Sequence, residues 1–509
     1  MALRRARRYG ILDSLLSIFE GTRGTVLTLL VLPFLLFLVL WLPPLSLGER
    51  LLYGGYTALS RSGGSVTVDD GAQLTVPAEA LKSSLRVQFG SISQLDFVKG
   101  NGEGVLEGAT DALPDHLILK SPIYLGGIKG DAPTYTIWTL PLPADSEPYA
   151  LLDLYEWNGA SWNWLPHRLW MDDRQIETRP KGVPTAVAVM QGEKLTAQIA
   201  AISDENGDFV PRAGSTLTQL SPRLYLVQGD GSVGQIFSLS PLFQQSGALL
   251  LPVLHNIDVN GVIRSDLVDN LLIDPNIWRS HVDQIEALVM STGHEGIIID
   301  YRSVDPALRG EFSNFILTLG QRLALRNKIL GVRVDEPVRL SEDEFRTGAY
   351  DWEVIGQAAT IVQVPVPRAA GVFAGENELR ALLGYATSHI NRYKLEIEVP
   401  VAPYQIVNNQ ARPVPYSDIL ALLSSLAGRQ EVTPETPLAE LDAKIESLSL
   451  DSASGSYRLI VNDSPIYLED ANNLARRLAL INEYHLGGVV VVDANQADPR
   501  VWDVLASYR

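Results

Sequence analysis

The stretch EGIIIDYRSV, from Glu295 to Val304, is the part of the sequence that indicates the fold. It follows a helix-like run and contains a short apolar segment that ends in charged residues, as a buried strand does. Alternation along a strand places Ile298, Asp300 and Arg302 on one face and the residues between them on the other. Asp300 and Arg302 are therefore expected to be neighbours on the same face.

Strand-like runs alternate with helical patterns from Leu195 onward, which is typical of a parallel βα array. We expect eight strands, within residues 196–206, 222–231, 248–258, 295–304, 327–338, 359–367, 394–404 and 486–495. This number predicts an α/β fold of the TIM (β/α)8 barrel type over residues 192–509. An insertion is expected at about 408–457, with its acidic segment 435–457 on the surface.

The stretch at 295–304 resembles the Asp-Gly-x-Asp-x-Asp-x-Glu motif on the fourth barrel strand of glycoside hydrolase family 18. Further blocks, at 299–323, 348–364, 467–489 and 497–505, resemble the chitinase-like and spore-cortex branch of that family in order and spacing. In this register Glu295 and Gly296 take the first two places, and Ile298 stands where the middle Asp would be. Asp300 matches the last Asp, and Arg302 occupies the place of the catalytic Glu.

The resemblance implies a site that has lost its proton donor. Family 18 enzymes protonate the leaving oxygen with the motif Glu, whereas a guanidinium has no transferable proton at ordinary pH. Other family positions differ as well: Pro367 stands for a Tyr that helps to hold the N-acetyl group, and Val492 stands for the Trp beneath the bound sugar. The degenerate site positions are Glu295, Ile298, Asp300, Arg302, Pro367 and Val492, so we expect no catalytic residue among them.

The same register places charges of both signs on inward positions of the barrel, namely Asp300, Arg302, Arg333, Asp335, Glu396 and Glu398. Because an isolated charge inside a barrel is unfavourable, we expect an ion-pair network with Arg302 in salt-bridge reach of Asp300 or a strand-seven glutamate. The alternative is a ligand-binding role for Asp300, Arg302, Arg333 and Glu398, with the guanidinium groups facing acidic cell-wall sugars.

The amino terminus predicts a membrane anchor. Residues 24–46 are uncharged and long enough to cross a bilayer as a helix, and the five Arg against two acids in residues 1–23 predict a cytoplasmic tail. Residues 47–62 are then a linker, and the following domains lie outside the cytoplasm at the cell membrane. A cleaved signal peptide is the alternative, but no small-x-small site follows the apolar run.

Residues 63–191 predict an all-β sandwich, because apolar alternation recurs on both sides of turn signals such as Asp70-Gly71 and Asn158-Gly159. The segments 66–81 and 154–165 resemble small immunoglobulin-like domains of bacterial surface proteins. Trp157, Trp162, Trp164 and Trp170 suit either sugar stacking or a hydrophobic core, and clustered hairpin aromatics more often fill a core.

The composition excludes several classes of protein. The net charge of −18 disfavours nucleic acid as a partner, and the absence of cysteine removes disulfides and thiolate chemistry. Seven scattered histidines without paired spacing predict neither a metal site nor a cofactor.

Three functions follow from these observations. The first is a membrane-anchored, non-catalytic barrel that binds envelope polysaccharide or a partner protein, and this is the function we favour. The second is an active glycoside hydrolase with a relocated acid, for which Asp300, Asp305, Glu398 and Asp493 are the candidate carboxylates. The third is an architectural surface scaffold.

Overall fold

A computed structural model describes residues 55–100, 104–203, 209–341, 343–366, 375–407, 410–428, 431–452 and 454–509. Among these residues no helix is both long and apolar enough to cross a membrane. The span predicted at 24–46 and the tail before it lie outside the described residues.

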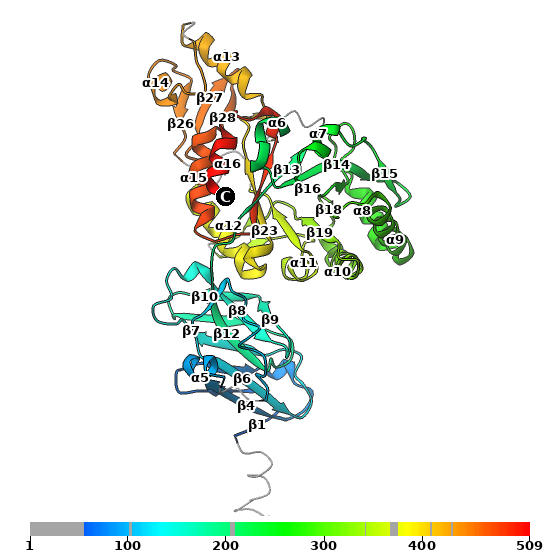
Figure 1. Cartoon of the computed structure of the whole chain (residues 1–509), viewed down its shortest axis with the longest axis vertical. Coiled ribbons are helices and arrows are strands. Elements are labelled where there is room, and N and C mark those ends of the chain that lie inside the picture. The colour runs from blue at the N-terminus through cyan, green and yellow to red at the C-terminus, as the bar shows by residue number, and fades with distance from the viewer. Residues whose placement is uncertain are drawn as a thin grey trace, which may run out of the picture.

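The first described part is a sandwich of two antiparallel sheets (Figure 1). Their inner faces share one hydrophobic core, to which Leu74 and Trp138 contribute from one sheet and Val87 and Leu154 from the other. One sheet contains β1 (Thr57–Leu59), β4 (Leu85–Ile92), β6 (Ile123–Lys129), β12 (Ala186–Gly192), β8 (Leu152–Trp157) and β9 (Trp162–Leu165) in this order, with β5 (Leu117–Leu119) beside β12. The other contains β10 (His167–Trp170), β11 (Gln175–Thr178), β7 (Ile137–Pro141), β3 (Gln73–Val76) and β2 (Gly64–Thr67).

The sandwich tryptophans serve mainly as core residues. Trp157 and Trp162 are buried and donate their indole N–H groups to backbone carbonyls of Val105 and Ala109. Trp164 donates to Asp153. No sugar-stacking platform is formed by the two buried rings, because their faces are covered.

Within the described residues, eight parallel strands close into a barrel, because β13 pairs with both β14 and β29. The fold is therefore a TIM-like α/β barrel, as predicted. In order around the barrel the strands are β13 (Gln198–Ser203), β14 (Gln219–Val227), β17 (Val253–His255), β18 (Gly296–Asp300), β19 (Ile329–Arg333), β22 (Ile361–Val364), β23 (Leu395–Pro400) and β29 (Gly488–Val492). β15 (Val233–Gln235) and β16 (Leu249–Leu250) also pair with β14.

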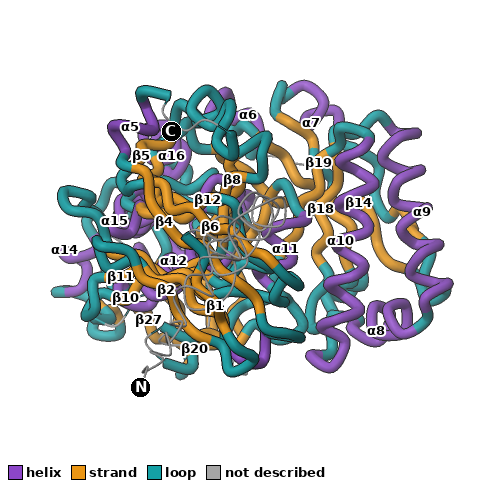
Figure 2. Tube along the Cα trace, turned by 90° about the horizontal axis from the view of Figure 1, so that it is seen from below, coloured by secondary structure: helices purple, strands orange, loops and turns teal. Residues whose placement is uncertain are grey.

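Helices surround the barrel and bury its outer face, where Ile297 and Ile299 join a large core with residues of α9 and α10. Figure 2 shows α8, α9 and α10 side by side on the outside of the strands. The helices are α6 (Val210–Ala213), α7 (Pro241–Gln245), α8 (Ser265–Ile273), α9 (Pro275–Thr292), α10 (Arg309–Leu325), α11 (Trp352–Ala358), α12 (Glu376–His389), α15 (Ala471–Asn482) and α16 (Val501–Tyr508).

The insertion between β23 and β29 is larger than the predicted range of about 408–457. It begins at β24 and ends at β28, because Tyr404 and Tyr467 pair across these two strands. Its elements are β24 (Tyr404–Val407), β25 (Gln410–Pro413), α13 (Tyr416–Leu426), α14 (Leu438–Asp442), β26 (Leu448–Leu450), β27 (Tyr457–Val461) and β28 (Ser464–Leu468). The acidic segment was wrongly assigned to the surface as a whole, because Leu441, Ile445 and Leu448 fill the insertion's own core.

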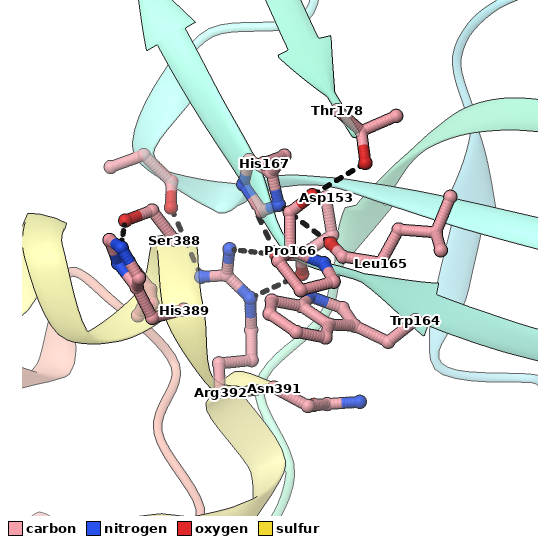
Figure 3. A network of polar contacts seen from close by, with 12 residues as sticks. Asp153, Trp164, Leu165, Pro166, His167, Thr178, Ser388, His389, Asn391 and Arg392 are labelled. Atoms are coloured by element: carbon pink, nitrogen blue, oxygen red, sulfur yellow. Dashed lines mark hydrogen bonds and ion pairs between the residues drawn. The ribbon is translucent and has the colours of Figure 1, made fainter. Parts of the chain in front are cut away.

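The sandwich and the barrel meet through a fully buried ion pair (Figure 3). Arg392, just before β23, donates to Asp153 of β8 from Nε at 2.6 Å and from Nη2 at 3.0 Å. The same guanidinium donates to the carbonyl of Tyr484, just before β29. The sandwich therefore contacts the end of the barrel where the strands begin, and the mouth, where the strands finish, faces away from it (Figure 1).

Candidate functional site

Asp300, the last residue of β18, is fully buried at the mouth and surrounded by three arginines. Arg302 donates to it from Nε and Nη2, both at 2.9 Å, which confirms the predicted salt bridge. Arg333 Nη1 lies 3.3 Å from Oδ1, and Arg223 Nη2 lies 3.8 Å from Oδ2. One carboxylate thus faces three guanidinium groups.

Arg333 joins Asp300 to a second carboxylate, Glu398 of β23. Its Nη2 donates to Glu398 Oε2 at 3.0 Å, and its Nε donates to Oε1. Both side chains are buried, so this is a bidentate ion pair without solvent screening. We refer to Asp300, Arg302, Arg333, Arg223 and Glu398 together as the charged cluster.

The arginines fix the protonation state of Asp300. Burial alone would raise the pKa of this carboxyl, but the charges of Arg302 and Arg333, with a smaller contribution from Arg223, hold the pKa well below its usual range. Asp300 is therefore ionised at any physiological pH and has no proton to donate.

The backbone of Arg302 is held by side chains of neighbouring loops. Asn256 donates from Nδ2 to the Arg302 carbonyl at 2.9 Å and accepts from the Arg302 amide at 2.8 Å. The next residue, Ser303, has a φ of 56° and donates its amide to Asp335 Oδ2 at 2.7 Å. Burial raises the pKa of Asp335. The Arg302 side chain remains 21% exposed, so it is accessible from the mouth.

Glu396 lies two residues before Glu398 on β23, deeper in the barrel and only 2% exposed. It accepts a hydrogen bond from Gln363 Nε2 at 2.8 Å. Burial raises the pKa of Glu396 to about 7, against opposing hydrogen bonds from Gln363 and Gln219. Among the described residues, the contacts that shift the pKa of Glu396 come from two glutamine side chains and from no basic group, so Glu396 retains its proton near neutral pH.

The other predicted site positions lie elsewhere. Glu295 is at the start of β18, 61% exposed and 3.7 Å from Lys328. Ile298 packs inside the barrel against Leu251 and Val253, and Val492 packs there with apolar residues of β13. Pro367 lies outside the described residues.

The remaining candidate carboxylates have local structural roles. Asp305 is exposed and caps a short helical turn by accepting from the Ala307 amide at 2.9 Å. Asp493 follows β29 with a φ of 59° and accepts a hydrogen bond from Tyr404. Within the described ranges, no group of three or more histidine, aspartate or glutamate side chains is placed to hold a metal ion.

Two members of the site were not predicted from the sequence. Arg223 is the single charged residue of β14, and a lone charge in a buried strand is a signal that could have indicated an inward, paired position. Asn256 gave no comparable signal, because an asparagine after a strand is common in loops.

No protein-family model matches the chain. The uncharacterised glycosylase YvbX of Bacillus subtilis is 26% identical over 147 residues, which are 27% of this chain and 42% of that protein. The chain covers about half or less of the length of the curated relatives that it matches.

Solved structures show the same fold. A chitinase from Chromobacterium violaceum aligns with a TM-score of 0.51 and 20% identity, over 62% of this chain and 99% of that one. The Bacillus cereus spore cortex-lytic enzyme SleL aligns with a TM-score of 0.51 and 16% identity, over 83% of this chain and 98% of that one. The barrel therefore has a fold like that of the glycoside hydrolase family 18 chitinases and spore cortex-lytic enzymes.

Proposed function

We propose that this chain is a membrane-anchored, extracytoplasmic protein whose barrel binds a cell-envelope glycan without hydrolysing it. The fold supports a glycan as the ligand, since the aligned proteins are named as a chitinase and a spore cortex-lytic enzyme. The uncharged segment at 24–46 supports the anchor.

The main support for the absence of hydrolysis is the bidentate ion pair between Arg302 and Asp300. A general acid must hold a proton that it can transfer to the leaving oxygen. Arg302 cannot transfer one, Asp300 is held ionised, and Glu398 is occupied by Arg333.

Glu396 does not restore the missing acid. It keeps a proton near neutral pH, but it is 2% exposed and hydrogen-bonded to Gln363 inside the barrel. A general acid must come within hydrogen-bond reach of the substrate, and a glycosidic oxygen at the mouth is not within reach of a side chain enclosed in this way.

One observation favours a second candidate, a hydrolase with a relocated acid. Asp335 lies near the cluster with its pKa raised by burial, while the neighbouring Asp300 has its pKa lowered. Two neighbouring carboxyl groups whose pKa values are shifted in opposite directions are the usual arrangement in glycoside hydrolases. If the full chain has hydrolytic activity, Asp335→Asn should abolish it while leaving glycan binding in place.

Binding can be tested by co-sedimentation of the detergent-purified full chain with purified peptidoglycan and with chitin. The wild type should pellet with at least one of them, and Arg302→Ala should reduce the bound fraction severalfold because it removes a partly exposed guanidinium of the cluster. Arg380→Ala is a matched control, since Arg380 pairs with Glu483 on the outer surface. A wild type that remains in the supernatant with both polysaccharides would favour the scaffold function instead.

The anchor can be tested separately by fusing alkaline phosphatase after residue 60. The arginines before the apolar segment predict that the fusion is active only outside the cytoplasm. Activity of a cytoplasmic reporter fused at the same position would contradict this orientation.

A further inference from the structure

Histidines gather where the sandwich contacts the barrel. Four of the seven in the chain lie there, namely His116, His167, His389 and His485. The ring of His116 has its centroid 4.7 Å from that of Tyr393, just before β23, and Nδ1 of His485 lies 2.9 Å from the carbonyl oxygen of Gly192 at the end of β12. Imidazole is the side chain whose charge ordinarily changes between about pH 5 and 8, so this contact is suited to respond to pH.

His167 of β10 lies on the sandwich side of the contact, and its side chain is only 3% exposed. Its Nδ1 is 3.1 Å from the carbonyl oxygen of Leu165, and because a carbonyl only accepts hydrogen bonds, the proton of the neutral ring is on Nδ1. Nε2 is 3.8 Å from Oδ1 of Asp153, the carboxylate that pairs with Arg392 (Figure 3). A second proton on His167 would therefore place another cation against a carboxylate that Arg392 already binds.

His389, the last residue of α12, lies on the barrel side, where α12 packs against β10. Its Nδ1 is 2.9 Å from the Tyr385 carbonyl oxygen and 2.8 Å from Ser388 Oγ, and its ring centroid is 4.1 Å from that of Tyr385. The charged or titratable side chains that act on His167 are Asp153, Arg392 and His389, and those that act on His389 are Glu353, Asp351 and Arg168. The two rings thus lie on opposite sides of one contact and influence each other.

The protonation of both rings depends on whether the contact is closed. Burial lowers the pKa of His167 and of His389, although nearby carboxylates oppose this shift. In water a histidine has a pKa of about 6.5, so separating the two parts would favour proton uptake. The closed contact is therefore most stable above about pH 6.5, and below it the equilibrium between closed and separated forms should shift by up to about tenfold per pH unit for each histidine.

We propose that the contact between the sandwich and the barrel is an acid-sensitive joint, which releases the barrel from the sandwich when His167 and His389 gain protons while both parts stay folded. Each part has a hydrophobic core of its own, and residues 193–197, between β12 and β13, connect them. Release would leave the mouth of the barrel free to turn relative to the sandwich. This inference concerns the direction in which the mouth is presented and goes beyond the proposed glycan binding.

The test is a distance measurement between the two parts. The chain contains no cysteine, so Glu107→Cys in the sandwich and Leu325→Cys at the end of α10, both at exposed positions, accept spin labels at those two sites alone. Double electron–electron resonance of the detergent-purified full chain should give a narrow distance distribution at pH 7.5 and a broad one at pH 5.0. The change should reverse on return to pH 7.5, and circular dichroism should show the same secondary structure at both pH values.

Replacement of the two histidines shows whether they are the groups responsible. His167→Asn combined with His389→Asn retains an amide donor near the position of each Nδ1 but cannot gain a proton, so the labelled variant should keep the narrow distribution at pH 5.0. The matched control is His294→Asn. His294 also has a pKa that burial lowers, but it hydrogen-bonds to Tyr225 of the barrel, so this variant should open in acid as the wild type does.

A wild type with the same distance distribution at both pH values would overturn the proposal. So would broadening that is accompanied by loss of the circular dichroism signal, because acid would then unfold the chain without releasing the joint. Broadening of the double variant at pH 5.0 would overturn the assignment to His167 and His389. A double variant that is already broad at pH 7.5 would count against it equally, because the rings would then hold the contact by packing whatever their charge.

Discussion

At the scale of single residues, the residue at position 302 determines whether the neighbouring Asp300 carboxyl can hold a proton. A glutamate at position 302 would repel Asp300 and raise its pKa, whereas Arg302 stabilises the charged form. Strand alternation alone predicts that Asp300 and Arg302 share a face. The contribution of Arg223 could not be predicted, because it depends on how a distant strand in the sequence is placed beside β18.

Glu396 gives a prediction about stability at this scale. Its pKa is raised to about 7 in the folded protein, above the value of about 4.3 in an unfolded chain. The stabilisation is fully present below pH of about 4.3 and is lost as pH rises through about 7, because only the folded state holds the proton in that window. Between pH 4.5 and 7.5 the free energy of unfolding should fall by about 3 kcal/mol more in the wild type than in Glu396→Gln.

Urea unfolding of the two proteins across this pH range measures the difference. Glu107→Gln, which changes an exposed glutamate of the sandwich, should have the same pH profile as the wild type. Parallel profiles for the wild type and Glu396→Gln would show that the Glu396 carboxyl does not titrate in this way.

At the scale of elements, the eight strands of the barrel were predicted because each apolar run is followed by a helical pattern. The insertion was predicted less well. The strands β24 and β28 lie at the two edges of the predicted insertion. They pair with each other through residues about sixty positions apart in the sequence, and local patterns do not reveal such a pairing. Local composition indicated acidity but not the core that Leu441 and Ile445 share.

Two helical glycines provide a matched test of helix packing. A Cβ at Gly320 of α10 would lie 2.5 Å from the carbonyl oxygen of Ala358, whereas a Cβ at Gly384 of α12 would meet nothing within 4 Å. Gly320→Ala should therefore destabilise the protein by about 1 to 3 kcal/mol through overpacking. Gly384→Ala should stabilise it by up to about 1 kcal/mol, since Ala is the better helix former. Equilibrium unfolding measures both, and a stabilising Gly320→Ala would mean that α10 and α11 are not packed this closely.

At the scale of the whole molecule, the buried pair of Asp153 and Arg392 joins the sandwich to the end of the barrel where the strands begin. The mouth consequently faces away from the sandwich (Figure 1). The sequence could not predict this pair, because the two residues are 239 positions apart and nothing local marks Asp153 as a partner of Arg392.

Arg392→Met should separate the unfolding of the two parts. It leaves Asp153 buried without its cation, which we expect to cost about 3 to 5 kcal/mol. Scanning calorimetry should then show a transition below the midpoint of the wild type. Arg380→Met, which breaks the exposed pair with Glu483, should change stability by less than about 1 kcal/mol. An unchanged midpoint for Arg392→Met would mean that the interface does not depend on this pair.

The central claim is that the barrel does not hydrolyse glycan, and cleavage of N-acetylglucosamine tetramer by the detergent-purified full chain tests it most directly. The account predicts no turnover from pH 4 to 8 for the wild type. It predicts none for Arg302→Glu either, because the positioning of the N-acetyl group, which can supply roughly 7 to 11 kcal/mol, would still be missing. Turnover by the wild type would contradict the claim, and turnover by Arg302→Glu alone would show that the sugar-holding part of the site is intact.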